Sequence, residues 1–216
     1  MGVVKMDVSL KINNDLLLVA FFMKENAWKN VNQTNFHRVL YFSAVLAPIY
    51  LFDEKWGYDF SNTIYGPSNI IITEQLRELS VKGFLEIEKI TVLTNRTEEL
   101  YCITDEGIGF CKTVLFCLKN KKKRVAWFKI IVKLLSLYGN DFMSKLIKEE
   151  PNIHNQSLEN QKSKLFIDNS ENNLSKQFFE FLKKQTDETL DSKNMKNEDY
   201  LLLFFDILYR KYKEGN

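Results

Sequence analysis

The sequence has few of the residue types that build disulfides, metal centres and nucleophilic active sites. Its 216 residues include only three cysteines and two histidines. Cys102, Cys111 and Cys117 are odd in number and form no C-x-x-C pair, so we expect free thiols that pack as small hydrophobic side chains in a reducing compartment. Neither His37 nor His154 has a cysteine or histidine neighbour at metal-ligand spacing. These shortages argue against a disulfide-stapled secreted domain and against a local zinc site.

Sequence motifs of the common enzyme classes are also missing. The chain contains no G-x-S-x-G, no P-loop and no H-E-x-x-H sequence. The adjacent acids Asp105-Glu106 and Glu149-Glu150 do not share a helix face, so we interpret them as helix-end charges rather than acid–base pairs. We therefore predict a protein that is not an enzyme and has no catalytic, metal-binding or cofactor-binding residues. A site assembled from residues distant in the sequence is the alternative.

Long hydrophobic runs and a strong excess of one charge are absent as well. No apolar run approaches the ~20 residues that cross a bilayer, and the N-terminus does not resemble a targeting peptide. The formal net charge is +2, which gives no overall field that would attract nucleic acid. We expect a cytoplasmic protein with no membrane contact.

The clearest pattern in the sequence lies between residues 65 and 107. Tyr65-Gly66-Pro67 marks a turn because glycine tolerates positive φ and proline fixes φ. One face of a following helix carries Ile72, Leu76 and Leu79, and Gly83 has the place of a C′ glycine. Two short strands then precede Thr104, which we expect to cap another helix. This order predicts the C-terminal half of a winged helix, with an unrelated αββα unit as the alternative.

Two apolar helices precede this stretch. Residues before Ile12 look loose, and a helix over Leu16–Lys24 is apolar nearly all round, so both its faces should be covered. A longer helix should begin at a cap formed by Thr34 or Asn35. Because Pro48 lies inside its pattern, we expect this helix to kink or restart there.

The predicted fold class is mainly α (α+β): a winged helix with a two-stranded wing, plus a C-terminal helical extension. We assign residues 1–151 to the winged-helix domain with its flanking helices, including one from about Asp105 to Leu118. Residues 152–173 are rich in Asn, Gln, Ser and Lys and predict a polar linker. Residues 174–216 predict a C-terminal pair of helices.

The last predicted helix, Asn197–Tyr212, is apolar on more than one side. A second stripe beside the first consists of Leu202, Phe205, Tyr209 and Tyr212. A surface helix of a monomer needs one such stripe, so the second must be covered by the rest of the chain or by a partner. We predict that it binds a partner, with burial inside this protein as the alternative.

Two features bear on DNA binding. The predicted recognition helix presents Glu74, Gln75, Arg77, Glu78 and Lys82. Its two carboxylates would repel phosphate, so it is a poor reader of a DNA groove. The densest run of positive charge contains Lys119, Lys121, Lys122, Lys123 and Arg124. These side chains are candidate contacts to the DNA backbone without sequence specificity, and a solvated loop between helices is the alternative.

Several segments together resemble a group of bacterial winged-helix proteins. They are Phe36–Leu51, Tyr65-Gly66-Pro67, Leu76–Gly83, Tyr101–Gly107 and Glu149-Glu150-Pro151. The group includes Panacea-type antitoxins and the middle components of ABC-three-component systems, which are the accessory subunits of Lamassu-type anti-phage defence. The helical tail after residue 151 favours the middle component.

The resemblance implies an adaptor subunit that joins an SMC-like or Rad50-like ATPase to a nuclease-type effector and restrains that effector. With these partners in mind, we expect Tyr65 and Pro67 to bind a partner, as well as the second stripe of the last helix. Two other functions remain open. The chain could be a MarR-like or PadR-like transcriptional regulator, or an antitoxin that binds a single toxin.

Overall fold

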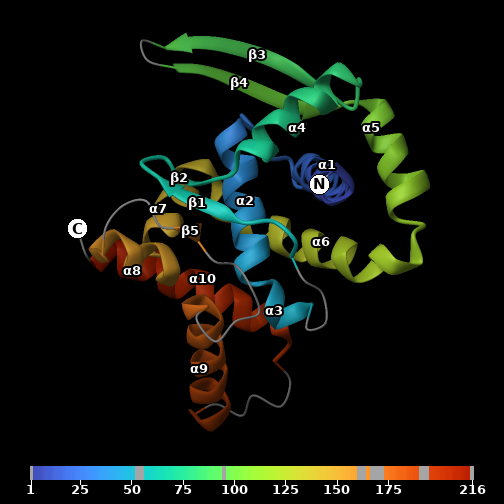
Figure 1. The fold of residues 1–216 in the computed structure, drawn as a ribbon. Helices are drawn as coiled ribbons and strands as arrows, with labels where there is room; N and C mark the ends of the chain where they lie inside the picture. Colours follow the sequence, from blue (N-terminus) through green and yellow to red (C-terminus); the bar gives the residue numbers. More distant parts are fainter. Residues whose placement is uncertain are drawn as a thin grey trace.

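The computed structural model describes residues 2–51, 56–93, 96–159, 164–165, 173–189 and 195–214. Within these residues the chain is mainly helical, with short antiparallel strands, which confirms the predicted α+β class (Figure 1). Among the described helices, none has the length and hydrophobicity required to cross a membrane.

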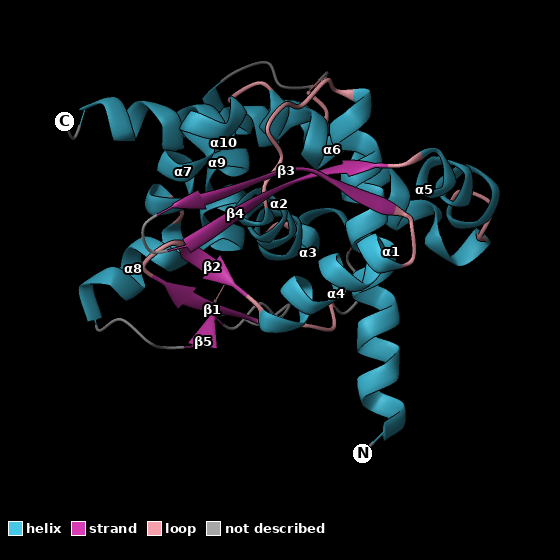
Figure 2. Cartoon of the chain, turned by 90° about the horizontal axis from the view of Figure 1, so that it is seen from above, coloured by secondary structure: helices cyan, strands magenta, loops and turns pink. Residues whose placement is uncertain are grey.

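Helix α1 (Gly2–Glu25) is the longest element of the fold. It begins ten residues before Ile12, so the expectation of a loose N-terminal segment was wrong. No glycine or proline interrupts the sequence between Val3 and Glu25, and the helix therefore continues without a break. All side chains from Leu16 to Met23 are buried, which confirms that both faces of this part are covered. The N-terminal turns of α1 extend away from the body (Figure 2).

Helix α2 (Gln33–Val45) crosses the centre of the fold. Its N-cap is Asn32, and not Thr34 or Asn35 as expected. The Asn32 and Asn35 side chains each accept a hydrogen bond from the other residue's backbone N–H, at 3.0 and 2.8 Å. The reciprocal pair satisfies two donors of the first helical turn. The predicted restart at Pro48 is confirmed, because α2 stops at Val45 and α3 (Ala47–Tyr50) carries the proline in its first turn.

The elements between residues 70 and 110 follow the predicted order. They are α4 (Ile70–Val81), β3 (Leu85–Leu93), β4 (Arg96–Ile103) and α5 (Asp105–Phe110). Gly83 has a φ of +78°, and Thr104 caps α5 by accepting the N–H of Gly107 at 3.1 Å, so both predicted helix ends are confirmed. The β3–β4 ribbon is longer than predicted and bulges between Ile87 and Lys89.

The single helix expected from residue 105 to residue 118 is broken. After α5 the chain forms a π-helical segment at Cys111–Leu115, turns, and passes through a 3-10 segment at Lys119–Lys121 into α6 (Lys122–Ser136). Leu118, expected on the buried side, is 40% exposed. Apolar spacing alone does not reveal a π turn, since widening one turn shifts the face that the following residues present.

A small three-stranded sheet was not predicted. Strand β1 (Phe60–Thr63) pairs antiparallel with β2 (Gly66–Ser68) on one side and with β5 (Lys164–Leu165) on the other. Its strands have two to four residues each, too few for a periodic signal to stand out in the sequence. The strand β5 docks part of the predicted linker onto the body.

The C-terminal region consists of α7 (Gly139–Glu149), α8 (Pro151–Glu159), α9 (Leu174–Thr189) and α10 (Asn197–Glu214). Helix α8 occupies the start of the predicted linker, where we expected no helix; residues 160–163 and 166–172 of that linker lie outside the described part. The core does not divide at residue 151. Phe204, Phe205 and Leu208 of α10 belong to the same buried cluster as the side chains of α1 and α2.

Candidate functional site

A tight β-hairpin beside α2 places Tyr65 at its tip. The hydroxyl of Thr63 donates to the carbonyl oxygen of Gly66 at 2.7 Å and accepts the N–H of Tyr65 at 3.2 Å. Gly66 has a φ of +102°, a conformation that L side chains rarely adopt, so the turn requires glycine here. As a result Ile64 and Tyr65 point outward, with exposed fractions of 87% and 58%.

His37 ties α2 to the beginning of α4. Its Nδ1 accepts the backbone N–H of Asn69 at 3.2 Å, which assigns the ring proton to Nε2, 3.2 Å from the hydroxyl oxygen of Thr73. Gln33 donates to the same hydroxyl oxygen at 2.7 Å. Burial lowers the pKa of His37 to about 4, so its imidazole is neutral at physiological pH. We interpret His37 as a structural residue that ties α2 to α4.

Strand β4 contributes two carboxylates beside the start of α2. The Asn32 amide donates to Glu98 Oε1 at 2.6 Å, and the hydroxyl of Tyr101 donates to Glu99 Oε2 at 2.5 Å. The backbone N–H of Tyr101 also donates to the carbonyl oxygen of Val31 at 2.8 Å. The first bond ties Glu98 to the N-cap of α2, whereas the second holds Glu99 to Tyr101 of its own strand.

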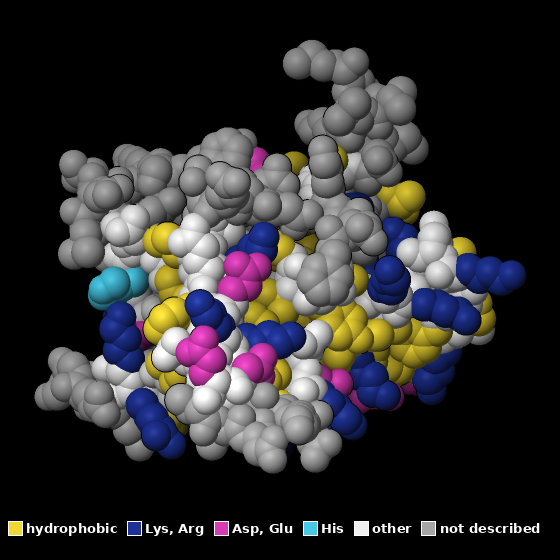
Figure 3. Space-filling model, turned by 90° about the horizontal axis from the view of Figure 1, so that it is seen from below, with side chains coloured by type: hydrophobic (Ala, Val, Ile, Leu, Met, Phe, Trp, Pro, Cys, Tyr) yellow, Lys and Arg dark blue, Asp and Glu magenta, His cyan; other side chains and the backbone are white. Residues whose placement is uncertain are grey.

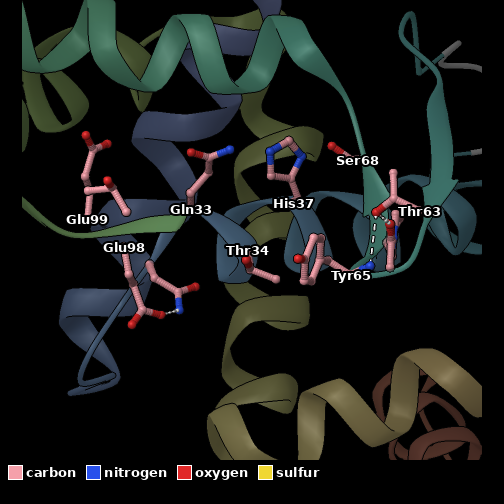
Figure 4. Close-up of a pocket in the computed structure, with 12 residues that line it drawn as sticks. Gln33, Thr34, His37, Thr63, Tyr65, Ser68, Glu98 and Glu99 are labelled. Carbon is pink, nitrogen blue, oxygen red and sulfur yellow. Dashed lines mark hydrogen bonds between the residues drawn. The ribbon is translucent and has the colours of Figure 1, made fainter. Parts of the chain in front are cut away.

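The hairpin, α2 and β4 together surround a polar pocket of about 200 Å³. Figure 4 shows Glu98 and Glu99 on one side, Tyr65 and Thr63 on the other, and His37 between them. We call this space the hairpin pocket. Its lining residues are Asn32, Gln33, Thr34, His37, Thr63, Tyr65, Gly66, Pro67, Ser68, Thr97, Glu98 and Glu99.

The residues predicted to bind a partner lie in two separate places. Tyr65 is exposed at the rim of the hairpin pocket, whereas Pro67 is buried in its wall. On α10, Leu202 and Tyr209 are half-buried, and Tyr209 packs edge-on against the Phe142 ring of α7. The side chain of the remaining predicted residue, Tyr212, lies outside the described part of the structure.

Phe205 does not face outward. It is completely buried, with its ring 5.3 Å from that of Phe42 and 6.1 Å from that of Tyr138, measured between centroids. The prediction of a partner contact is therefore corrected for this residue, since Phe42 of α2 and Tyr138, between α6 and α7, pack against its ring. For Phe205 the alternative interpretation, burial inside this protein, is the correct one.

The basic run divides into an exposed part and one buried residue. Arg124 is 1% exposed and forms an ion pair with Asp15 of α1, so it cannot contact a DNA backbone as predicted. Among the lysines, Lys121 is half-buried, and the exposed ones are Lys119, Lys122 and Lys123. Figure 3 shows Lys and Arg side chains around a hydrophobic area on the lower face of the molecule.

Glu150 is a buried residue that sequence reasoning missed. It is 0% exposed, and its carboxylate accepts bonds from the hydroxyls of Tyr41, at 2.6 Å, and Ser175. It also accepts the N–H of Ile153 at 2.9 Å, as a cap on α8. The sequence offered only the adjacency of Glu149 and Glu150 before a proline, which indicates a helix end and gives no sign of burial.

The cysteines differ in their surroundings. Cys111 is fully buried, and burial raises the pKa of its thiol to about 12, whereas Cys117 is exposed. Cys102 of β4 lies near Glu86 and Glu88 of β3, with potential ligand atoms within 4.8 Å of one another. Both carboxylates are exposed, and burial and the adjacent Glu88 raise the pKa of the Cys102 thiol, so the uncharged thiol is favoured.

No protein-family model matches the chain, and a search of curated proteins gives no match.

Proposed function

We propose that this chain is a non-enzymatic adaptor subunit, built around a winged helix, that holds two other proteins together. The observation that carries the proposal is the exposure of apolar side chains on the β3–β4 ribbon. Ile90 is 59% exposed and Val92 81% exposed, two positions apart on one strand. Apolar side chains grouped on a projecting ribbon are typical of a protein-binding surface. Figure 2 shows this ribbon lying across one face of the molecule.

The order of α4, a positive-φ glycine, the β3–β4 ribbon and α5 supports the winged-helix assignment. In that assignment α4 is the recognition helix and the ribbon is the wing. The outward side chains of α4 offer few base contacts, because Glu74 is an exposed carboxylate and Lys82 is paired with Glu78 at 2.5 Å, although Arg77 is exposed. Gln75, another candidate for base contact, is 7% exposed and faces the core. Protein recognition therefore suits this winged helix better than base readout.

The resemblance to middle components of ABC-three-component systems names the partners of the adaptor. We propose an SMC-like or Rad50-like ATPase on one side and a nuclease-type effector, restrained by the complex, on the other, in bacterial anti-phage or anti-plasmid defence. The buried titratable residues of the described structure fit a role without chemistry. Asp15, His37 and Glu150 each make hydrogen bonds that join separate helices.

Co-purification tests this proposal. The tagged chain is expressed together with the products of the genes adjacent to its own, and we expect a coiled-coil ATPase to be retained. Ile90→Thr with Val92→Thr should reduce that retention, because threonine keeps β-propensity and removes apolar area. Leu137→Ser removes an exposed apolar side chain elsewhere, at the end of α6, and is the matched control. A lone tagged chain, or capture of a single small toxin in place of an ATPase, contradicts the proposal.

A DNA-binding regulator is the second candidate, favoured by the exposed lysines at the beginning of α6. Lys119, Lys122 and Lys123 lie within one short segment and can reach phosphates. A gel shift with random duplex at physiological salt tests this function for the isolated chain. Binding that falls with salt and with loss of these lysines would support the regulator over the adaptor.

A further inference from the structure

The chain concentrates its positive charge between residues 107 and 140. This segment contains seven lysines, one arginine and no aspartate or glutamate, although the whole chain has a formal net charge of only +2. The arginine, Arg124, is neutralised by Asp15 in the core. Within the described part of the chain, none of the seven lysines takes part in an ion pair. The segment therefore carries a positive charge that no neighbouring carboxylate pairs with.

Six of these lysines are exposed: Lys112, Lys119, Lys122, Lys123, Lys129 and Lys133. The first two belong to the π-helical and 3-10 segments, which lie at the edge of the molecule (Figure 1 and Figure 2). Lys122, Lys129 and Lys133 follow on α6 at a spacing that places them on one face of the helix, over a length of about 16 Å. We call the surface that these six side chains form the lysine surface.

Two aliphatic side chains are exposed among the lysines. Val114 is 38% exposed and Leu118 is 40% exposed. The N–H of Leu118 donates to the carbonyl oxygen of Val114 at 3.2 Å, so the two residues belong to one turn and lie on the same side of it. Phe116 anchors this turn to α1, because its ring centroid lies 5.0 Å from that of Phe21. Val114 and Leu118 are therefore presented to solvent from a packed base.

The residue types of this surface favour a lipid bilayer over other anionic partners. Protein interfaces are enriched in arginine and aromatic side chains and depleted in lysine, whereas residues 107–140 contain no exposed arginine and no exposed aromatic. The phosphates of DNA would attract the lysines and leave Val114 and Leu118 in water. An anionic bilayer accommodates both, because lysines bind among its phosphates while aliphatic side chains enter the boundary below them.

We propose that the lysine surface binds the surface of an anionic lipid bilayer, with Val114 and Leu118 inserted at the depth of the headgroups. The sequence led us to expect no membrane contact because it has no apolar run long enough to cross a bilayer, but a surface contact needs no such run. Each lysine near an anionic bilayer strengthens binding about fivefold, so several together give stable attachment. The inference is independent of the adaptor function and of its partners.

Co-sedimentation of the full chain with vesicles tests the proposal. Vesicles of phosphatidylcholine with about 30 mol% phosphatidylglycerol should retain the protein at physiological ionic strength, and vesicles of phosphatidylcholine alone should bind it about tenfold more weakly or less. Added salt should weaken the binding, because it screens the lysine charges. Equal retention on both kinds of vesicle, or retention on neither, would overturn the proposal.

Lysine variants identify the surface that binds. Lys122→Gln with Lys123→Gln should weaken vesicle binding about 25-fold, at about fivefold for each lysine. Lys29→Gln with Lys89→Gln removes the same charge from exposed lysines outside the surface and should bind like the parent. If the two double variants bind equally weakly, net charge and not the lysine surface is responsible, and the assignment fails.

An aliphatic variant separates a bilayer from other polyanions. Val114→Ser with Leu118→Ser keeps every charge, and the partial exposure of both side chains predicts a thermal midpoint close to that of the parent. We expect vesicle binding to fall about tenfold, because the inserted apolar area is lost. Unchanged vesicle binding would refute the insertion of these side chains.

Cys117 gives a direct readout of insertion. Its thiol is exposed and it lies between Val114 and Leu118 in the sequence, whereas Cys111 is buried. On a Cys102→Ser background, a polarity-sensitive fluorophore attached to Cys117 should shift its emission to shorter wavelength on phosphatidylglycerol vesicles. The absence of a shift on vesicles that retain the protein would contradict the proposal. Retention on random duplex DNA without retention on vesicles would also overturn it, and would favour the DNA-binding regulator.

Discussion

Arg124 and Asp15 are 109 positions apart in the sequence and form a two-pronged ion pair inside the core. Arg124 Nε lies 2.6 Å from Asp15 Oδ1, and Nη2 lies 2.5 Å from Oδ2. The hydroxyl of Tyr58 donates to the same carboxylate at 3.0 Å, and the Trp56 ring lies 4.1 Å from the guanidinium carbon. The pair joins α1 to α6 and holds the segment before β1 between them.

Removing one member of this pair should destabilise the protein strongly. Asp15→Ala leaves the Arg124 charge buried without its partner, so we expect a loss of about 3–5 kcal/mol in the free energy of unfolding, measured by urea denaturation. Asp15→Leu with Arg124→Met replaces both charges by apolar side chains and should recover most of that loss. A single change that costs less than about 1 kcal/mol would show that the pair is not buried as described.

His37 should make stability depend on pH between about 6.5 and 4. Burial lowers its pKa from 6.5 to about 4 in the folded protein, so the unfolded chain takes up a proton first as pH falls. Folding stability is therefore fully present above pH 6.5 and decreases below it, by about 3 kcal/mol once pH 4 is passed. His37→Gln keeps an acceptor for the Asn69 N–H and cannot titrate. The free energy of unfolding, measured by denaturation at several pH values in this range, should change less with pH in the variant than in the parent. An equal pH dependence in the two proteins would contradict the assignment.

Substitution of Gly83 and of Gly107 should destabilise the protein for different reasons. Gly83 has a φ of +78° with open space around a built Cβ, so Gly83→Val is expected to cost about 1–2 kcal/mol through backbone strain alone. Gly107 has no such φ, but a Cβ there would lie 2.3 Å from the carbonyl oxygen of Phe84. Gly107→Ala should therefore lower the thermal midpoint further than Gly83→Ala. The reverse order would contradict the close approach of α5 to the start of β3.

The two sides of α10 should respond differently to charge. Phe205→Asp places a carboxylate in the core and is expected to cost several kcal/mol, seen as insolubility or a much lower thermal midpoint. Tyr209→Asp changes a half-buried side chain and should leave the isolated chain folded. If Tyr209→Asp also fails to bind the co-purified partner, the exposed side of α10 takes part in that contact. A normal thermal midpoint for Phe205→Asp would refute the burial of this face.

The lysines before α6 should be dispensable for folding. Charge reversal of Lys121, Lys122 and Lys123 to Glu is expected to change stability by less than about 0.5 kcal/mol each, because none of them is buried. Arg124 is left unchanged in this variant, because substituting it would break the buried ion pair with Asp15 and destabilise the core. In an assembled complex, a weaker and less salt-dependent interaction with DNA would identify this segment as a backbone contact. If the variant complex binds DNA with the same affinity and the same salt dependence as the parent complex, this segment does not contact DNA.

Local chemistry explains which parts of the fold could be predicted. The helix stop at Gly83, the cap at Thr104 and the break at Pro48 each depend on the covalent properties of one residue and its immediate neighbours. Several of the errors involved a distant segment. Strand β5 forms only because residues 164–165 lie beside β1, and Phe205 is buried because Phe42 of α2 and Tyr138 pack against it. The hairpin pocket likewise joins residues from three separate elements.

The sequence by itself determined the helical class, the turn at Tyr65-Gly66-Pro67 and the ribbon between α4 and α5, because these follow from steric limits and side-chain periodicity over a few residues. Only the tertiary structure decided that Arg124, which follows exposed lysines in the sequence, is buried and paired with Asp15. The same holds for Glu150, which is buried among hydroxyls while its neighbour Glu149 is not. Desolvation and pairing depend on what packs against a residue from elsewhere in the chain. Two adjacent residues of the same charge can therefore have opposite environments, and their spacing in the sequence gives no sign of it.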